Sequence, residues 1–160
     1  MVAPTAALAA RTITRVSARA FVHPKVSGGG GGNPVDVFLA RPSSSPSDND
    51  TLTLPPDVRS RLAQSCEWES VIAHLPSASA GEEGQRPVLS FHMPSGEEVS
   101  FCAHAALGAA SVLGQEVTQD EGSNSTARVV EFTTTTDESV QSVSISTDTG
   151  EAELKMSAKL

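Results

Sequence analysis

The alternation of hydrophobic and polar positions predicts short strands along most of the chain. In the segment 16–22, Val16, Ala18, Ala20 and Val22 fall on one face, as in a half-buried strand. Similar patterns, bounded by residues that favour turns, predict further strands over 35–39, 68–75, 88–93, 99–101, 128–134, 140–146 and 152–157.

Two segments follow helical spacing instead. The first begins near Asp57, a residue suited to an N-cap, and carries Val58 and Leu62 on an apolar face. The second, over 104–113, is rich in Ala, and nearly all of its sides are small or apolar, which is typical of a buried helix. Gly114 is predicted to end it.

The order of these elements predicts an α+β fold. We expect a mixed or antiparallel sheet that forms a half-barrel around one buried central helix. We also expect a flexible N-terminus over 1–14 and one folded unit over 15–158. Within that unit, the polar stretches rich in Ser, Pro, Asp and Gly predict mobile loops over 41–53 and 77–87.

Composition narrows the classes of function. The 160 residues carry 11 Lys and Arg against 19 Asp and Glu, a formal net charge of −8, so we expect no nucleic-acid partner. No apolar run has the length of a membrane-spanning helix, so we expect no membrane partner. Two cysteines are too few for a disulfide framework or a structural zinc site, and they are typical of free thiols in a reducing compartment. We therefore expect a cytoplasmic protein, with a mitochondrial location as the alternative because the acid-free, Arg-containing start resembles a presequence.

A run of five glycines, Gly28–Gly32, separates the first two predicted strands. No Lys follows in the spacing of a phosphate loop, and a strand rather than a helix comes next, so neither a phosphate loop nor a dinucleotide fingerprint is indicated. A flexible hairpin connection is the structural alternative. The histidines His23, His74 and His92 lack ligand spacing such as HxH or HxxxH, so we predict no metal site.

Candidate chemistry lies where the predicted strand 99–101 leads into the Ala-rich helix. Cys102, Ala103 and His104 occupy this junction, where free backbone N–H groups and the helix dipole favour a carboxylate or an oxyanion. We expect the junction to lower the pKa of the Cys102 thiol, and His104 to be able to move a proton. Glu69, beside a hydrophobic run, suits general acid–base work. Each residue also has a purely structural alternative. His104 would be a cap or core histidine, Glu69 a solvated carboxylate at a strand end, and Cys102 a small buried side chain.

Three segments in this order, GGNPVDVFLA, WESV and EEVSFCAHAALGAASVL, resemble the N-terminal half of the phenazine biosynthesis-like (PhzF-like) proteins, which have the diaminopimelate epimerase fold. The resemblance covers roughly residues 16–158. The third segment is the most specific, because it agrees with the family pattern at Glu98, Val99, Phe101, Cys102, His104 and Ala105.

The resemblance implies an isomerase without metal or organic cofactor that removes and returns a proton at a carbon of a small carboxylate substrate. It assigns proton transfer to Glu69 and His104. In related amino-acid epimerases a catalytic thiol stands at the position of Cys102, whereas Ala103 stands where the family has Gly. The resemblance also implies substrate contacts in the GGNP loop and at the helix start, at Gly32, Asn33, Cys102, Ala103 and Ala105.

Members of this family are roughly twice as long and hold their active site between two similar lobes. The resemblance therefore implies that this chain is an N-terminal lobe with no second lobe present, so that a separate second lobe or a homodimer would complete the site. One alternative is a non-catalytic half-lobe that binds a small carboxylate or a partner without turnover. Another is a fragment that exposes its lobe-facing surface.

Overall fold

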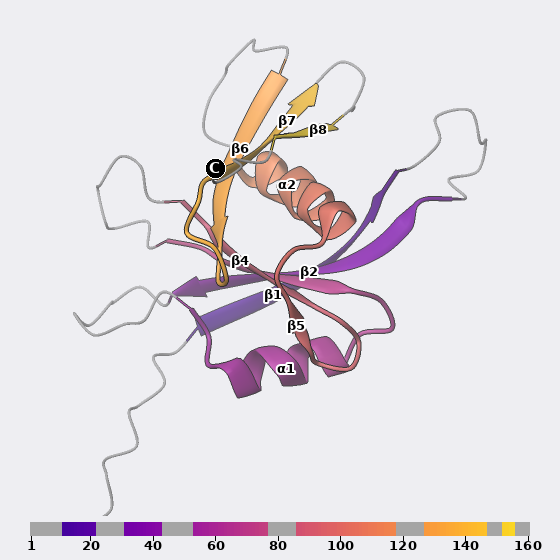
Figure 1. Cartoon of the computed structure of the whole chain (residues 1–160), viewed down its shortest axis with the longest axis vertical. Helices are drawn as coiled ribbons and strands as arrows, with labels where there is room; N and C mark the ends of the chain where they lie inside the picture. Colours follow the sequence, from indigo (N-terminus) through magenta and orange to yellow (C-terminus); the bar gives the residue numbers. More distant parts are fainter. Residues whose placement is uncertain are drawn as a thin grey trace, which may run out of the picture.

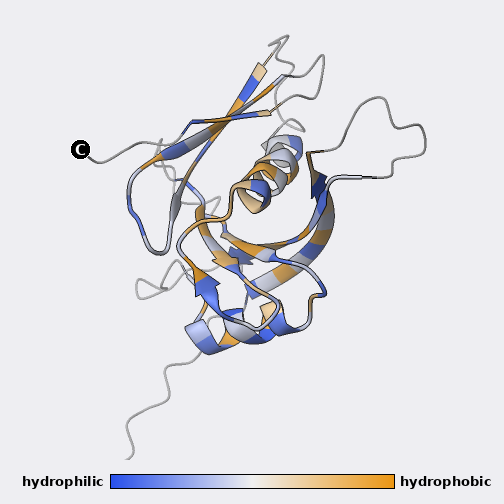
Figure 2. Ribbon diagram, turned by 45° about the vertical axis from the view of Figure 1, so that its right-hand side comes forward, coloured by the Kyte–Doolittle hydropathy of each residue, from blue (hydrophilic) through white to orange (hydrophobic). Residues whose placement is uncertain are grey.

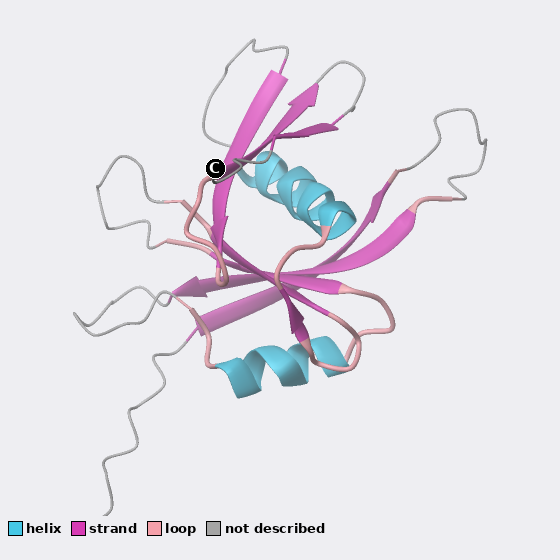
Figure 3. Cartoon of the chain, viewed as in Figure 1, coloured by secondary structure: helices cyan, strands magenta, loops and turns pink. Residues whose placement is uncertain are grey.

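Eight strands and two helices make up the described part of the computed structural model, which comprises residues 11–21, 31–42, 53–76, 86–117, 127–146 and 152–155. Figure 3 shows how these elements are distributed. In chain order they are β1 (Arg11–Ala20), β2 (Asn33–Pro42), α1 (Pro56–Gln64), β3 (Ser70–His74), β4 (Val88–His92), β5 (Glu98–Val99), α2 (Ala103–Val117), β6 (Ala127–Thr134), β7 (Gln141–Ser146) and β8 (Ala152–Lys155).

The strands form one mixed sheet in the order β1-β2-β3-β4-β6-β7-β8, with β5 paired to β4. The pairs β2–β3 and β4–β6 are parallel and the others are antiparallel. Strands from both ends of this order, β1 and β8, contact α2, so the sheet curls around that helix (Figure 1). The predicted α+β fold, with a half-barrel around a central helix, is confirmed.

The inner face of the sheet is packed against α2. Alternate residues of β2, Val35, Val37 and Leu39, are buried there together with side chains from β3, β4, β6 and β7. A Cβ built on Gly108 would lie 2.4 Å from Val35 Cγ1, so the helix comes close to β2. The helix can do so because the side chains on its buried surface are mostly methyl groups, those of Ala105, Ala106, Ala109 and Ala110.

Helix α1 covers the opposite face of β2 and β3 (Figure 1). A second hydrophobic cluster lies there, formed by Phe38, Ala40, Leu54, Cys66 and Ile72. Because both faces of these central strands are covered, residues 35–40 of β2 and all five residues of β3 are buried. The strands with one solvent face instead alternate between hydrophobic and hydrophilic residues, as their colours in Figure 2 show.

A row of polar side chains crosses the sheet on the face that α1 covers. Of its members, Asp36, Ser70 and His92 are at most 2% exposed. The strand register aligns the row across β1 to β5, in the order Ser17, Asp36, Ser70, His92 and Glu98. This face is therefore both hydrophobic under α1 and polar along one line of the sheet.

Asp36 is the most buried carboxylate of this row. Burial alone would raise its pKa, but Arg15 donates two hydrogen bonds to it, at 3.1 and 2.7 Å, and Ser17 donates a third at 2.8 Å. These bonds and the guanidinium charge outweigh burial and hold the pKa of Asp36 below its usual value. The ion pair fastens the edge strand β1 to β2.

The first strand differs from the sequence prediction. β1 begins at Arg11 rather than at residue 16, so residues 11–14 belong to the sheet and not to the expected flexible N-terminus. It ends at Ala20, because Phe21 has a φ of 58°, outside the strand conformation, and Val22 lies outside the described residues. Pro42 still belongs to β2. Most of the predicted loops 41–53 and 77–87 lie outside the described residues.

The structure also differs from the sequence prediction at the start of α1 and at the end of α2. Asp57 is not the N-cap of α1, because Pro55 holds that position, and its carboxylate instead pairs with Arg61 at 2.7 Å. The prediction that Gly114 ends the Ala-rich helix is wrong, since α2 continues past it. The carbonyl of Gly114 accepts a hydrogen bond from the side chain of Arg128 on β6 at 3.0 Å. A contact with the sheet thus satisfies a backbone carbonyl near the end of the helix. Neither helix of the described residues is long and apolar enough to cross a membrane.

The close approach at Gly108 predicts a specific effect of a single methyl group. In Gly108→Ala the new Cβ must displace the stiff side chain of Val35, and we expect a loss of about 1–3 kcal/mol in the free energy of unfolding. Gly114→Ala is the matched control, because its Cβ would lie 3.6 Å or more from its neighbours and would raise helix propensity. Urea unfolding of both variants measures the difference, and equal stability of the two would contradict the packing argument.

His74 makes the stability of the protein depend on pH. Its side chain is buried, and its Nδ1 accepts the N–H of Leu54 at 3.2 Å. Burial, with the charges of Arg59 and Arg11, lowers the pKa of His74 from 6.5 to about 3. The folded protein thus holds a neutral imidazole where the unfolded chain takes up a proton. The free energy of unfolding should therefore fall as the pH decreases from about 6.5 towards 3.

Urea unfolding at pH 7.5 and at pH 4.5 tests this expectation. In His74→Gln, which keeps an acceptor for Leu54 but does not titrate, we expect the loss between these pH values to shrink by about 2 kcal/mol. His92, whose pKa burial also lowers, accounts for part of what remains. Asp36 does not interfere, because its pKa is lowered from 3.8 and its contribution is lost only below that range. An unchanged pH dependence in the variant would show that His74 is not the cause.

Candidate functional site

The structure brings together Glu69, Cys102 and His104, three of the residues selected from the sequence. Nδ1 of His104 lies 3.2 Å from Sγ of Cys102, and its Nε2 lies 3.8 Å from Oε2 of Glu69. The side chain of His104 is 15% exposed and that of Glu69 is 37% exposed, so solvent reaches the group from the side of Glu69. Sγ of Cys102 also lies 3.9 Å from Nε2 of His104. One imidazole is therefore within 4 Å of both a thiol and a carboxylate.

Local structure explains why these residues meet. Glu69 directly precedes β3, which spans Ser70–His74 and not the whole of the predicted strand 68–75. Its carbonyl accepts the N–H of Asp36 at 3.2 Å, which holds it beside β2. Cys102 occupies the N-cap position of α2, since its carbonyl accepts the N–H of Ala106 at 2.9 Å. The helix start thus presents Cys102 and His104 to the end of the sheet where Glu69 lies.

The prediction that the helix start lowers the pKa of Cys102 is wrong. Burial raises the pKa of the thiol, and the nearby carboxylate of Glu69 raises it further. Backbone N–H groups of Ala105 and His104 interact with Sγ and act in the opposite direction, but they do not compensate. At neutral pH the sulfur is therefore a protonated thiol, suited to donating a proton and unsuited to acting as a thiolate nucleophile.

Gly32 and Asn33 lie at the same end of the sheet as Glu69. Because β2 and β3 run parallel with Asp36 opposite Ser70, Asn33 extends two positions beyond the level of Glu69. Asn33 is exposed, and Gly32 has a φ of 79°, a conformation that favours glycine. Gly28–Gly30 of the same run lie outside the described residues. Substrate contacts by Gly32 and Asn33 stay a prediction.

The predicted substrate contacts of Ala103 and Ala105 would be made by their backbone N–H groups, because neither residue has a functional side chain. Ala103 is the exposed first residue of α2, and Phe21, not Ala103, is the non-glycine residue with positive φ in the described part of the chain. An alanine here therefore causes no strain in the backbone. The methyl group of Ala105 is fully buried in the core between α2 and the sheet. Its backbone N–H group interacts with Sγ of Cys102.

A metal centre is not indicated by the side chains that the structure describes. Among those residues, no group of three or more His, Cys, Asp or Glu could hold an ion. His74 and His92 lie in the layer under α1 and are at most 2% exposed.

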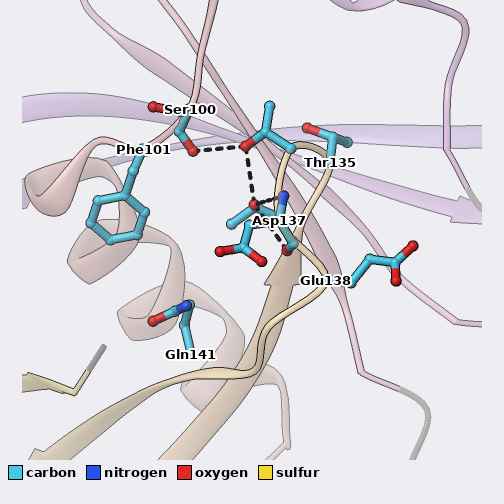
Figure 4. A pocket seen from close by; sticks show the side chains of 8 residues that line it. Ser100, Phe101, Thr135, Asp137, Glu138 and Gln141 are labelled. Atoms are coloured by element: carbon cyan, nitrogen blue, oxygen red, sulfur yellow. Dashed lines mark hydrogen bonds between the residues drawn. The ribbon is translucent and has the colours of Figure 1, made fainter. Parts of the chain in front are cut away.

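A separate open pocket of about 710 Å³ lies beside the segment that leads into Cys102 (Figure 4). Ser100 and Phe101 form one side, and the turn from Thr134 to Glu138, with Gln141, forms the other. None of Glu69, Cys102 and His104 lines it, so this pocket and the predicted site are distinct. No pattern in the sequence indicated this pocket, because its two sides come from segments more than 30 residues apart in the chain.

Comparison with family models found no match, and no curated protein matches this chain. Among solved structures, a crystal structure of a methylitaconate-delta-isomerase is similar, with a TM-score of 0.46 and 8% sequence identity. The match covers 94% of this chain and 38% of that chain, so this chain spans well under half of that protein. A likeness this weak carries no argument about family or activity. The PhzF-like resemblance of the three segments therefore stays a prediction.

The raised pKa of Cys102 predicts slow alkylation of its thiol. In a Cys66→Ala background, we expect iodoacetamide to modify Cys102 with a pH profile whose midpoint lies above the ordinary value of 9.0. Glu69→Gln removes a charge that disfavours the thiolate, so the midpoint should move down.

Glu67→Gln is the control for this experiment, because Glu67 is an exposed carboxylate two residues away. It should leave the alkylation profile unchanged. A midpoint at or below 9.0 in the Cys66→Ala protein would instead mean that the helix start governs the thiol.

Proposed function

We propose that this protein is a PhzF-like isomerase or epimerase that transfers protons at a carbon of a small carboxylate substrate without a cofactor. The observation that carries the proposal is the placement of one imidazole, that of His104, within 4 Å of both a thiol and a carboxylate at the first turn of a buried helix. General acid–base chemistry needs such groups within reach of one another. The two free cysteines support a cytoplasmic location.

In the proposed reaction, the Glu69 carboxylate takes a proton from the carbon next to the substrate carboxylate. The electron pair of the broken C–H bond moves into the carboxyl group and forms an enediolate. Backbone N–H groups at the start of α2, near Ala103, would hold that negative charge. A proton then returns to the same carbon in an epimerisation, or to a carbon conjugated with the enediolate in an isomerisation. The donor is the protonated imidazolium of His104, or the Cys102 thiol acting through the neutral imidazole, and exchange with solvent then removes the proton from Glu69 and restores it to the donor.

The second candidate is a non-catalytic half-lobe that binds a small carboxylate or a partner without turnover. The 3.8 Å between Nε2 of His104 and Oε2 of Glu69 favours it, because this separation exceeds a hydrogen bond. The catalytic proposal therefore includes a separate second lobe or a second copy of the chain whose contact with the substrate draws these groups together.

Solvent proton exchange tests the proposal. We expect that incubation in D2O with a panel of small amino and unsaturated carboxylic acids, followed by NMR, will detect deuterium entering one C–H position. Glu69→Gln and His104→Ala should each lower the exchange rate by about 10²–10⁴-fold, the usual contribution of a positioned acid or base. The exposed neighbour Glu67→Gln should leave it unchanged.

The two candidates give different outcomes in this experiment. Exchange that survives both site variants would show that the assigned residues are wrong. Folded protein that binds a carboxylate but exchanges no proton, alone and at concentrations that favour dimers, would support the half-lobe instead.

A further inference from the structure

Helix α1 is fastened to the sheet by a layer of contacts that is separate from the core around α2. Phe38 and Ile72 of the sheet belong to this outer layer, and Leu54 and Cys66, on either side of α1, pack with them. Strands β2 and β3, which precede and follow this segment in the chain, pair directly with each other. The hydrogen bonds of the sheet therefore do not depend on α1, and the helix can detach without breaking them.

His74 holds the start of this segment. It is fully buried, and its Nδ1 accepts the backbone N–H of Leu54 at 3.2 Å, two residues before α1 begins. A neutral imidazole that accepts at Nδ1 carries its proton on Nε2. Among the described residues, Nε2 of His74 has no hydrogen-bond partner. The imidazole is therefore tied to Leu54 by one nitrogen, and only in its neutral form.

A proton added to His74 breaks this connection. The charged imidazole carries N–H groups on both nitrogens, so Nδ1 would present a hydrogen to the N–H of Leu54 instead of a lone pair. Two donors that face each other in a buried layer are both left unsatisfied, which is costly. Detachment of residues 54–66 lets water reach both nitrogens of the ring, and water is what the charged form requires.

Burial and all the charges that act on His74 lower its pKa. Those charges belong to Arg59 of α1, Arg11 of β1 and, once it is protonated, His92 of β4. The carboxylate of Glu98 on β5 pairs with Arg59 at 2.8 Å and acts on His92. Because Arg59 belongs to the helix, its repulsion from a charged His74 acts between α1 and the sheet.

We infer that α1 is a proton-sensitive cover: uptake of a proton by His74 releases residues 54–66 from the sheet while the layer around α2 stays folded. The release uncovers Phe38 and Ile72, hydrophobic side chains of the outer face. The inference goes beyond the pH dependence of overall stability, because it assigns the proton to the opening of one layer. It does not depend on the proposed function, since no residue of the proposed active site takes part in it.

Hydrogen exchange of the full chain, followed by mass spectrometry, tests this inference. Protection of peptides from α1 is compared with that of peptides from α2, each relative to the exchange rate of an unfolded chain at the same pH. We expect the α1 peptides to be less protected than the α2 peptides at both pH 7.5 and pH 5.0. Between these pH values the protection of α1 should fall about thirtyfold or more, the effect of one imidazole that takes up a proton near pH 6.5 only when the layer is open.

Two variants assign the effect to His74. His74→Gln keeps an acceptor for Leu54 but takes up no proton, so its loss of α1 protection should be about thirtyfold smaller. His92, whose pKa burial lowers in the same layer, accounts for what remains. His104→Gln is the matched control, because it removes an imidazole at the start of α2, outside this layer, and should leave the loss intact.

Three results would overturn the inference. The first is equal protection of α1 and α2 at both pH values, which would mean that the protein opens as one unit. The others are α1 protection that does not change with pH, and equal losses in the unchanged protein and in His74→Gln. If His74→Gln fails to fold, the pH profile of the unchanged protein decides. A loss that begins near pH 6.5 supports the imidazole, whereas a loss that begins only below about pH 5, where carboxylates take up protons, overturns it.

Discussion

The close packing of α2 against β2 is the constraint on which the rest of the structure depends. A helix rich in alanine, with Gly108 against Val35, occupies so little width that strands from both ends of the sheet can reach it. Larger side chains on this surface would push the sheet outward and open the half-barrel. Curvature of the sheet is thus a consequence of small residues on the helix.

The same packing creates the candidate site. Because α2 is held inside the sheet, its first turn ends near the start of β3, and Cys102 and His104 come to lie beside Glu69. The burial that fastens the helix also raises the pKa of the thiol, so packing and chemistry are linked through one helix end. The same turn of chain, one residue earlier, supplies Phe101 to the neighbouring pocket.

The outer layer shows a different balance of forces. Under α1 the sheet carries a hydrophobic cluster and a line of polar side chains together. Burial of Asp36 is tolerated because Arg15 and Ser17 supply hydrogen bonds, whereas His74 is tolerated because it stays neutral. Folding of this layer is therefore tied to the protonation of its buried side chains, while the inner layer is held by hydrophobic packing around α2.

Sequence by itself determined the element types, the α+β class and the buried nature of the Ala-rich helix, because periodicity and residue size act locally. It also selected Glu69, Cys102 and His104 as candidate site residues from their local contexts, and folding brings these three together. Only the tertiary structure decided the direction of the Cys102 pKa shift, since burial and the charge of Glu69 come from segments distant in the chain. Helix ends were decided in the same way: Gly114 is a stop signal locally, yet contacts with the sheet carry the helix past it. The Asp137–Phe101 pocket was equally out of reach, because a cavity exists only between segments that folding brings together.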